Sequence, residues 1–159
     1  MFVRDFVYVE VPAARVKDRL LSGNGEWLRA LAVGAYAEGE ELRARIGPGE
    51  SVGVAKTVTL EMGSASEHGD VLVVPVKWEA TGAPGLFPRM DATLELAAFG
   101  PDTCQLTLLG RYEVPFGPVG QAVDRLLLHR VAEATVRSLL KRMADALADV
   151  GEKSLASVT

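Results

Sequence analysis

The chain has 159 residues, of which 48% are hydrophobic and 24% are charged, and this composition is typical of one folded domain rather than a disordered chain. Its 17 basic and 21 acidic residues give a net charge of −4, so binding to nucleic acid or to an anionic membrane is not expected. The single cysteine, the charges within residues 1–5 and the lack of a stretch of roughly 20 apolar residues predict a cytoplasmic protein without stable membrane insertion.

The first part of the sequence predicts a strand and two short helices. Residues 2–11 alternate and are rich in β-branched and aromatic side chains, as in a strand. Pro12 ends this strand and suits the first turn of a helix, and residues 13–21 have the spacing of a short amphipathic helix. A second short helix is predicted from Glu26 to about Ala37, and Gly39 closes it.

The middle of the sequence predicts a meander of five strands, because the apolar residues change from a helical period to a period of two at residue 40. The expected strands are 40–46, 51–62, 71–80, 88–99 and 103–114. A polar loop, 63–69, separates the second of these strands from the third. Pro75 cannot donate a ladder hydrogen bond, which suggests a sheet edge or a bulge. Polar and apolar side chains alternate along the last strands, as in an antiparallel sheet with one solvated side.

Residues 119–149 predict one long helix, followed by a polar tail, 152–159, that we expect to fray. From Leu128 onward this helix has a core side that includes Val136, Leu139 and Met143, and a charged side formed by Glu133, Arg137, Lys141 and Asp145. Before Leu128 apolar residues lie on the side that later carries the charges; they are Val119, Val123, Leu126 and Leu127. The helix could bend near Leu128, its first turns could pack under neighbouring loops, or polar groups there could line the mouth of a pocket. The order of elements predicts an α+β fold in one domain, 1–151.

Several short segments share a loose pattern with a known family. They are Val11-Pro12-Ala13-Ala14, Glu26-Trp27-Leu28, Trp78-Glu79-Ala80-Thr81-Gly82, Leu86-Phe87-Pro88, Gly110-Arg111-Tyr112-Glu113-Val114-Pro115-Phe116-Gly117, Asp124-Arg125 and His129-Arg130-Val131-Ala132-Glu133. With these segments, nearly the whole chain resembles the START-related helix-grip superfamily, often called SRPBCC, which includes polyketide cyclase/dehydrase-type proteins.

This resemblance implies a helix-grip fold: a curved antiparallel sheet of about six strands around a long C-terminal helix, with two short helices between the first and second strands. It also implies a cavity between sheet and helix that takes up lipids, polyketides, hormones or other apolar molecules. The shared segments are structural rather than catalytic, so the fold alone does not choose between a carrier, a sensor and a cyclase.

Three residues are candidates for chemistry, each with a plainer alternative. Lys56 interrupts an apolar strand face, where its ammonium would need a ligand carboxylate or a protein acid, unless a bulge or a strand edge turns it to solvent. Tyr112 faces inward on the last strand and could donate to a ligand carbonyl, act as an acid, or be a core tyrosine. His129 could act as a general base, although its position on the helix is lateral. The other histidine, His68, lies in a polar loop and is expected to be exposed.

Other kinds of site have no support in the sequence. No histidine, cysteine or carboxylate cluster has metal-ligand spacing, no glycine-rich phosphate loop follows a strand, and no serine sits in a nucleophile elbow. Cys104 lies on an apolar strand face and is expected to be a buried structural thiol. We therefore expect neither a metal nor another cofactor.

The sequence favours binding of a small hydrophobic or amphipathic ligand, oriented by Lys56 and Tyr112. The apolar wall is expected to consist of Val74, Val76, Trp78, Leu94, Leu106, Leu108, Leu128 and Leu139. One alternative is a polyketide cyclase or dehydratase-type enzyme in the same cavity, with Tyr112, Lys56 and His129 as acid and base candidates. A second alternative is a protein-interaction module, such as a homodimer, formed through the apolar face from Val119 to Leu127.

Overall fold

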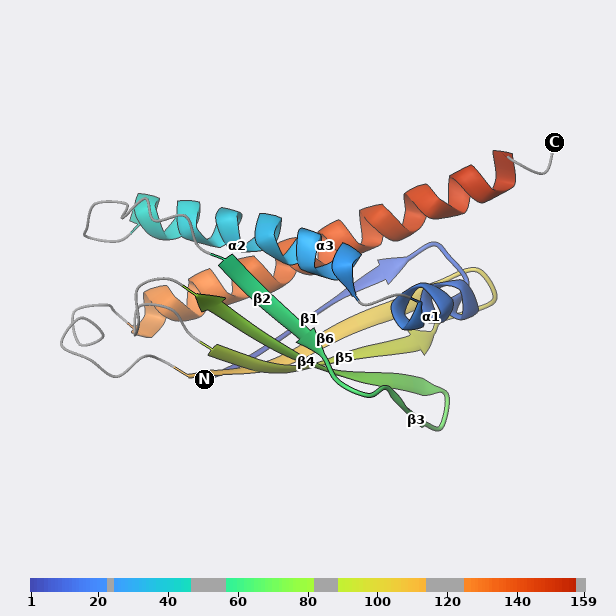
Figure 1. The fold of residues 1–159 in the computed structure, drawn as a ribbon, viewed down its shortest axis with the longest axis horizontal. Coiled ribbons are helices and arrows are strands. Elements are labelled where there is room, and N and C mark those ends of the chain that lie inside the picture. The colour runs from blue at the N-terminus through green and yellow to red at the C-terminus, as the bar shows by residue number, and fades with distance from the viewer. Residues whose placement is uncertain (23–24, 47–56, 82–88, 114–124, 157–159) are drawn as a thin grey trace.

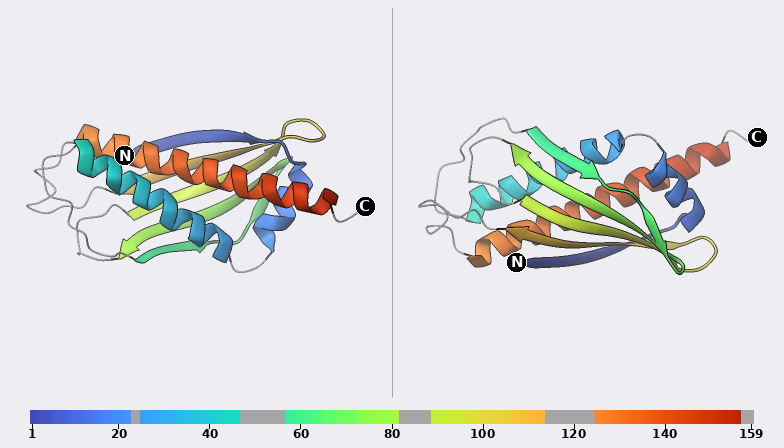
Figure 2. Two further views of the ribbon diagram at one scale, coloured as in Figure 1. Left: turned by 90° about the horizontal axis from the view of Figure 1, so that it is seen from above. Right: turned by 60° about the horizontal axis from the view of Figure 1, so that its bottom comes forward.

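The protein has two layers, an antiparallel sheet and a pair of helices that cover one of its faces (Figures 1 and 2). The computed structural model describes residues 1–22, 25–46, 57–81, 89–113 and 125–156. The strands are β1 (Phe2–Val9), β2 (Thr57–Met62), β3 (Ser66–His68), β4 (Val71–Thr81), β5 (Arg89–Ala98) and β6 (Cys104–Glu113). The helices are α1 (Ala13–Leu21), α2 (Glu26–Ile46) and α3 (Arg125–Ala156). The predicted α+β helix-grip architecture is thus confirmed.

The strands lie in the order β1-β6-β5-β4-β2, and the short β3 pairs with β4 beyond the end of β2. All described pairings are antiparallel. β1 and β2 therefore form the two edges, and the chain returns to β1 only after the meander is complete. The long helix α3 packs on α2 and on β1, whereas α2 also contacts β2.

The predicted alternation of the strands is confirmed by their burial. On β5, Met90, Leu94 and Leu96 face the helices and are buried, while Arg89 and Asp91 point to solvent. On α3, Val136, Leu139 and Met143 are buried on the predicted core side. Arg137, Lys141 and Asp145 are exposed on the predicted charged side. The sheet and α3 thus bury their apolar faces against each other, which is the main stabilising contribution in a domain of this kind.

Two predicted helix boundaries are wrong. The second helix is not short, because α2 runs for 21 residues to Ile46 and so includes the segment 40–46 that was expected to be a strand. The last helix continues through Gly151 to Ala156 instead of ending near residue 149. Within the described residues the sheet still has six strands, because the predicted loop 63–69 contains β3. Residues 119–124 lie outside the described residues, so the three possibilities for the first turns of the last helix stay predictions, as does the interaction face from Val119 to Leu127.

Pro75 lies in an interior strand, at the point where the neighbour of β4 changes from β2 to β3. Met62 pairs with Val76 and Ser66 pairs with Val73, so three residues, 63–65, stand opposite two on β4. The backbone nitrogen of Gly63 donates to the carbonyl oxygen of Pro75 at 2.8 Å. The missing N–H of Pro75 thus falls at a bulge, the second of the two predicted settings.

The edge strand β1 is partly protected by one of its own side chains. Met1 and Tyr112 exchange both of their backbone hydrogen bonds, so odd-numbered residues of β1 bond to β6 and even-numbered residues turn their N–H outward. The outward N–H of Phe6 donates to Asp5 Oδ1 at 2.9 Å, and Arg137 Nε on α3 donates to Asp5 Oδ2 at 3.1 Å. A charged side chain that occupies an edge in this way discourages pairing with another strand.

Candidate functional site

One row of large side chains crosses the inner face of the sheet from the edge strand β1 to the edge strand β2. Its members pair directly across neighbouring strands and are Met1, Tyr112, Met90, Trp78 and Leu60. The next row contains Gly110 and Ala92 and is much smaller. A Cβ on Gly110 would lie 2.8 Å from Met90 Sδ, which shows that the Met90 thioether lies over this glycine. The row thus combines aromatic rings with long, unbranched methionine side chains that adapt readily to what they contact.

The Tyr112 hydroxyl is the polar group of this row. The residue is only 2% exposed, and its hydroxyl oxygen lies 3.1 Å from Met1 Sδ and 3.3 Å from Nδ1 of His129 on α3. The two rings are nearly parallel, with an angle of 20° between their planes and 6.5 Å between their centroids. The structure therefore brings together two of the three residues that the sequence singled out for chemistry.

A third residue extends this pair. Glu133, one helical turn after His129, places Oε1 3.3 Å from His129 Nε2. The His129 side chain is 32% exposed and that of Glu133 is 46% exposed, so the chain of contacts runs from solvent to the buried phenol. We call Glu133, His129 and Tyr112 the polar triad. The sequence pattern of the last helix placed Glu133 on its solvated face. The i,i+4 spacing between His129 and Glu133 was the sequence signal for their contact.

Burial controls the acidity of this site. Burial of the phenol, with a smaller effect of the Glu133 carboxylate, raises the pKa of Tyr112 from its ordinary value of 10.0 to about 12. Both causes disfavour the phenolate, because a buried anion loses its hydration and the nearby carboxylate repels it. Tyr112 is therefore a neutral phenol at physiological pH, able to donate one hydrogen bond and to accept others.

The predicted apolar wall is buried on the inner face of the sheet and on α3. These residues are at most 4% exposed and are Val74, Val76, Trp78, Leu94, Leu106, Leu108 and Leu139. The side chain of Leu128 and the whole of Lys56 lie outside the described residues. Contact of the wall with a ligand, and the inward orientation of Lys56, remain predictions.

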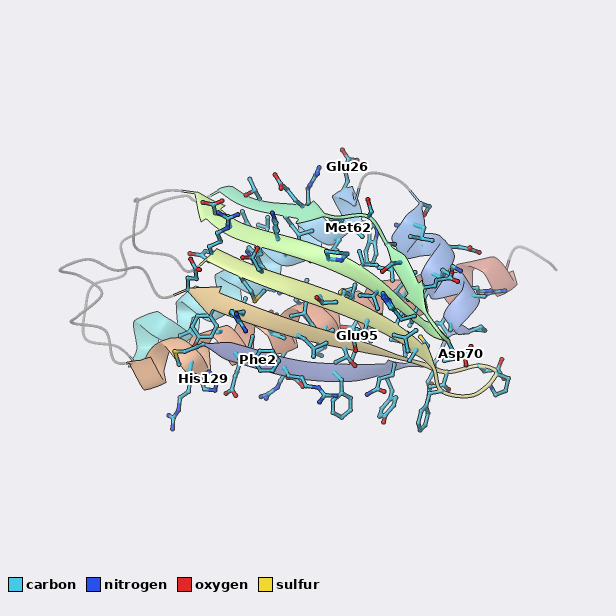
Figure 3. The ribbon with its side chains drawn as sticks, turned by 90° about the horizontal axis from the view of Figure 1, so that it is seen from below. Phe2, Glu26, Met62, Asp70, Glu95 and His129 are labelled. Atoms are coloured by element: carbon cyan, nitrogen blue, oxygen red, sulfur yellow. The ribbon has the colours of Figure 1, made fainter. Side chains whose placement is uncertain are left out.

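A groove with a volume of about 450 Å³ lies at the edge of the sheet farthest from β1, along the edge strand β2. Figure 3 shows Met62 at this edge, and Phe2 and His129 at the β1 edge. The residues that line the groove are Leu20, Leu21, Gly25, Arg29, Glu61, Met62, Gly63, Ala65 and Val74. Arg29 Nε donates to the carbonyl oxygen of Leu60 at 3.0 Å, which ties the start of α2 to β2. Of the predicted wall residues, Val74 alone lines this groove. None of the three residues of the polar triad lines it, so the groove and the polar triad are separate sites.

Cys104 is buried and His68 is exposed, as predicted, but His68 lies on a strand instead of in the expected loop. Cys104 is fully buried, and burial raises the pKa of its thiol to about 11, so it is a structural residue. His68 is exposed on β3. Within the described ranges, no three histidine, cysteine or carboxylate side chains gather as they would around a metal ion. None of the helices, as far as their residues are described, is long and apolar enough to cross a membrane.

Solved structures share this architecture. A conserved protein from Geobacillus kaustophilus has a TM-score of 0.56 and 16% identity, over 94% of this chain and 96% of that protein. The Zhui aromatase/cyclase from Streptomyces sp. R1128 has a TM-score of 0.51 and 13% identity, over 93% of each chain. Ara h 8.0201 has a TM-score of 0.50 and 11% identity, over 94% of this chain and 98% of that protein. No family model and no curated protein matches the sequence.

At such low identities the likeness concerns the fold alone. The chain has a helix-grip fold, as the sequence resemblance implied, and the shared coverage shows that this fold extends over nearly the whole chain. The aromatase/cyclase in this group is an enzyme, and its activity does not pass to this chain with the fold.

Proposed function

We propose that this protein binds a small hydrophobic or amphipathic molecule between the sheet and α3, with the Tyr112 hydroxyl fixing its orientation. The observation that carries this proposal is one buried phenol among apolar side chains, with its hydroxyl at 3.1 Å from Met1 Sδ and 3.3 Å from His129 Nδ1. Sites for apolar ligands are built in this way, from an apolar lining and a few placed polar atoms.

The energetics of such a site are simple. Each Å² of apolar surface that the ligand buries contributes about 25 cal/mol, and one hydrogen bond adds about 1 kcal/mol. Affinity would therefore come from the apolar wall, and the tyrosine would select among ligands of similar size. Met90 can change rotamer at low cost, which would make room for a ligand beside Tyr112.

Two measurements test the proposal. Native mass spectrometry of the purified protein should reveal a co-purified small molecule, and titration with a fluorescent fatty-acid analogue should show saturable binding. Tyr112→Phe should weaken this binding about fivefold, the equivalent of one hydrogen bond. Tyr8→Phe removes the same atom from an exposed tyrosine on the outer face and should change nothing. If no apolar probe binds saturably, the proposal is wrong.

The polar triad favours a second candidate function, a cyclase or dehydratase-type enzyme that acts on a carbonyl-bearing chain. A histidine that contacts both a carboxylate and a phenol is a common arrangement for acid–base catalysis. The two functions differ in their response to mutation. If Tyr112→Phe and Lys56→Met abolish turnover of a poly-carbonyl substrate and leave its affinity nearly intact, the enzyme is the better description.

A further inference from the structure

The polar triad contains a limited number of hydrogen atoms, and their distribution determines what Tyr112 can offer a ligand. An ionised Glu133 can only accept, so the hydrogen at His129 Nε2 points to its Oε1, at 3.3 Å. His129 Nδ1 lies 3.3 Å from the phenol oxygen, and either group can donate in this contact. Met1 Sδ, 3.1 Å from the same phenol oxygen, can only accept.

Two protonation states are consistent with Glu133 as an acceptor. In the neutral imidazole the hydrogen is on Nε2, so Nδ1 must accept the phenol hydrogen, and Met1 Sδ then receives none. In the imidazolium both ring nitrogens carry hydrogen, so Nδ1 donates to the phenol oxygen and the phenol hydrogen is directed at Met1 Sδ. The imidazolium thus provides a donor for each of the three contacts, at 3.3, 3.3 and 3.1 Å.

We propose that Glu133 and His129 are positioning residues that make Tyr112 a hydrogen-bond donor, and that the ligand presents an acceptor oxygen, from a ketone or a carboxylate, at the place of the Met1 thioether. A thioether is a weak acceptor, whereas a carbonyl or carboxylate oxygen is a strong one. A ligand of this class would therefore displace Met1 Sδ and gain a stronger hydrogen bond, which is charge-assisted when its oxygen belongs to a carboxylate. This inference rests on the proposed function and adds the chemical class of the ligand.

The polar groups around His129 support a Tyr112 hydroxyl that donates its hydrogen towards Met1 Sδ. Glu133 on α3 faces Nε2 of His129, and the neutral phenol of Tyr112 on β6 faces Nδ1 of the same ring. The Met1 amine donates to the backbone oxygen of Tyr112 at 2.8 Å.

The first test reads the polar triad without a ligand. Nitrogen-15 NMR of the histidine rings reports which nitrogens carry hydrogen. Glu133→Gln should change how hydrogen is distributed between the two ring nitrogens of His129, because the carboxylate that accepts from Nε2 is replaced by a neutral amide. Asp145→Asn, on the exposed face of the same helix, is the matched control and should leave it unchanged. If Glu133→Gln also leaves the His129 signals unchanged, the inference is wrong.

The second test compares a long-chain methyl ketone, the fatty acid and the alkane of similar length by native mass spectrometry and calorimetry. The ketone or the fatty acid should bind about tenfold more tightly than the alkane at pH 6, which is the effect of one strong hydrogen bond. This preference should disappear in Tyr112→Phe and shrink in Glu133→Gln, and it should be kept in Asp145→Asn. Equal affinity for all three probes would overturn the inference and leave the proposed function intact. Absence of binding by all three would overturn both.

Discussion

Replacement of Tyr112 by phenylalanine should make the free energy of unfolding less sensitive to alkaline pH. The pKa of Tyr112 is raised from 10.0 to about 12 by burial and by Glu133. The folded state therefore holds the phenol proton at a pH at which the unfolded chain has lost it. The stabilisation linked to this proton is complete below pH 10 and is lost as the pH rises towards 12. It amounts to roughly 3 kcal/mol over the whole range and to roughly half of that at pH 11.

The assay is urea unfolding of the protein and of Tyr112→Phe at pH 8 and at pH 11. At pH 8 the variant lacks the hydroxyl contacts, and its free energy of unfolding should differ from that of the parent by about 1 kcal/mol. Between pH 8 and pH 11 the parent should lose roughly 1 kcal/mol more than the variant. The Cys104 thiol, whose pKa burial raises to about 11, titrates in both proteins and cancels. Tyr8→Phe should follow the parent. If Tyr112→Phe also loses stability in parallel with the parent, the phenol is not buried as described.

Three further predictions follow from burial and from the edge of the sheet. Leu20→Ala should lower the free energy of unfolding, measured in urea, by about 3 kcal/mol, because the Leu20 side chain is only 2% exposed. Leu21→Ala, at a side chain that is 49% exposed, should lower it by well under about 1 kcal/mol. Similar losses at both positions would show that α1 does not bury the face described here. The Cys104 thiol should react with a disulfide reagent at pH 8 far more slowly in the native protein than in urea, and a fast native reaction would contradict its burial. Asp5→Ala should expose the outward N–H of Phe6 and increase self-association in light scattering, and a strictly unchanged mass at high concentration would show that this edge needs no protection.

The strands of the sheet were predictable because each has one buried face and one solvent-exposed face. The segment 40–46 shows the limit of this rule. Leu42, Ala44 and Ile46 alternate with charged residues, which favours a strand. The same segment is rich in glutamate, arginine, leucine and alanine, all good helix formers. Seven residues are too few for the period to decide between the two, and in the structure α2 continues through Gly39 to Ile46. A single glycine costs a helix only about 1 kcal/mol, so it was a weak stop signal.

The candidate site was predictable in its parts and not in its assembly. The period of two placed Tyr112 on the inner face, and the low number of histidines drew attention to His129. Their contact joins β6 to α3 across segment 114–124, and no local pattern specifies the length of α3 or its tilt over the sheet. The contact with Glu133 was visible as an i,i+4 pair, but charged pairs on a helix surface are common and contribute little by themselves. Its significance depends on the phenol, which only the tertiary structure brings near.

The longer α2 changes where a ligand could enter. α2 and α3 lie side by side over the inner face (Figure 2), and Arg142 on α3 pairs with Glu38 on α2. A Cβ on Gly34 would lie 2.7 Å from Arg142 Nη1, so the guanidinium lies directly on the α2 backbone. Hydrogen bonds from Ser138 and Arg142 lower the pKa of Glu38, so this contact is favourable at neutral pH. Because the helices are joined at this point, separating them would break several contacts at once. A ligand that entered at the end of α3 that carries His129 would leave this contact between the helices intact, and the exposed part of the polar triad lies at that end.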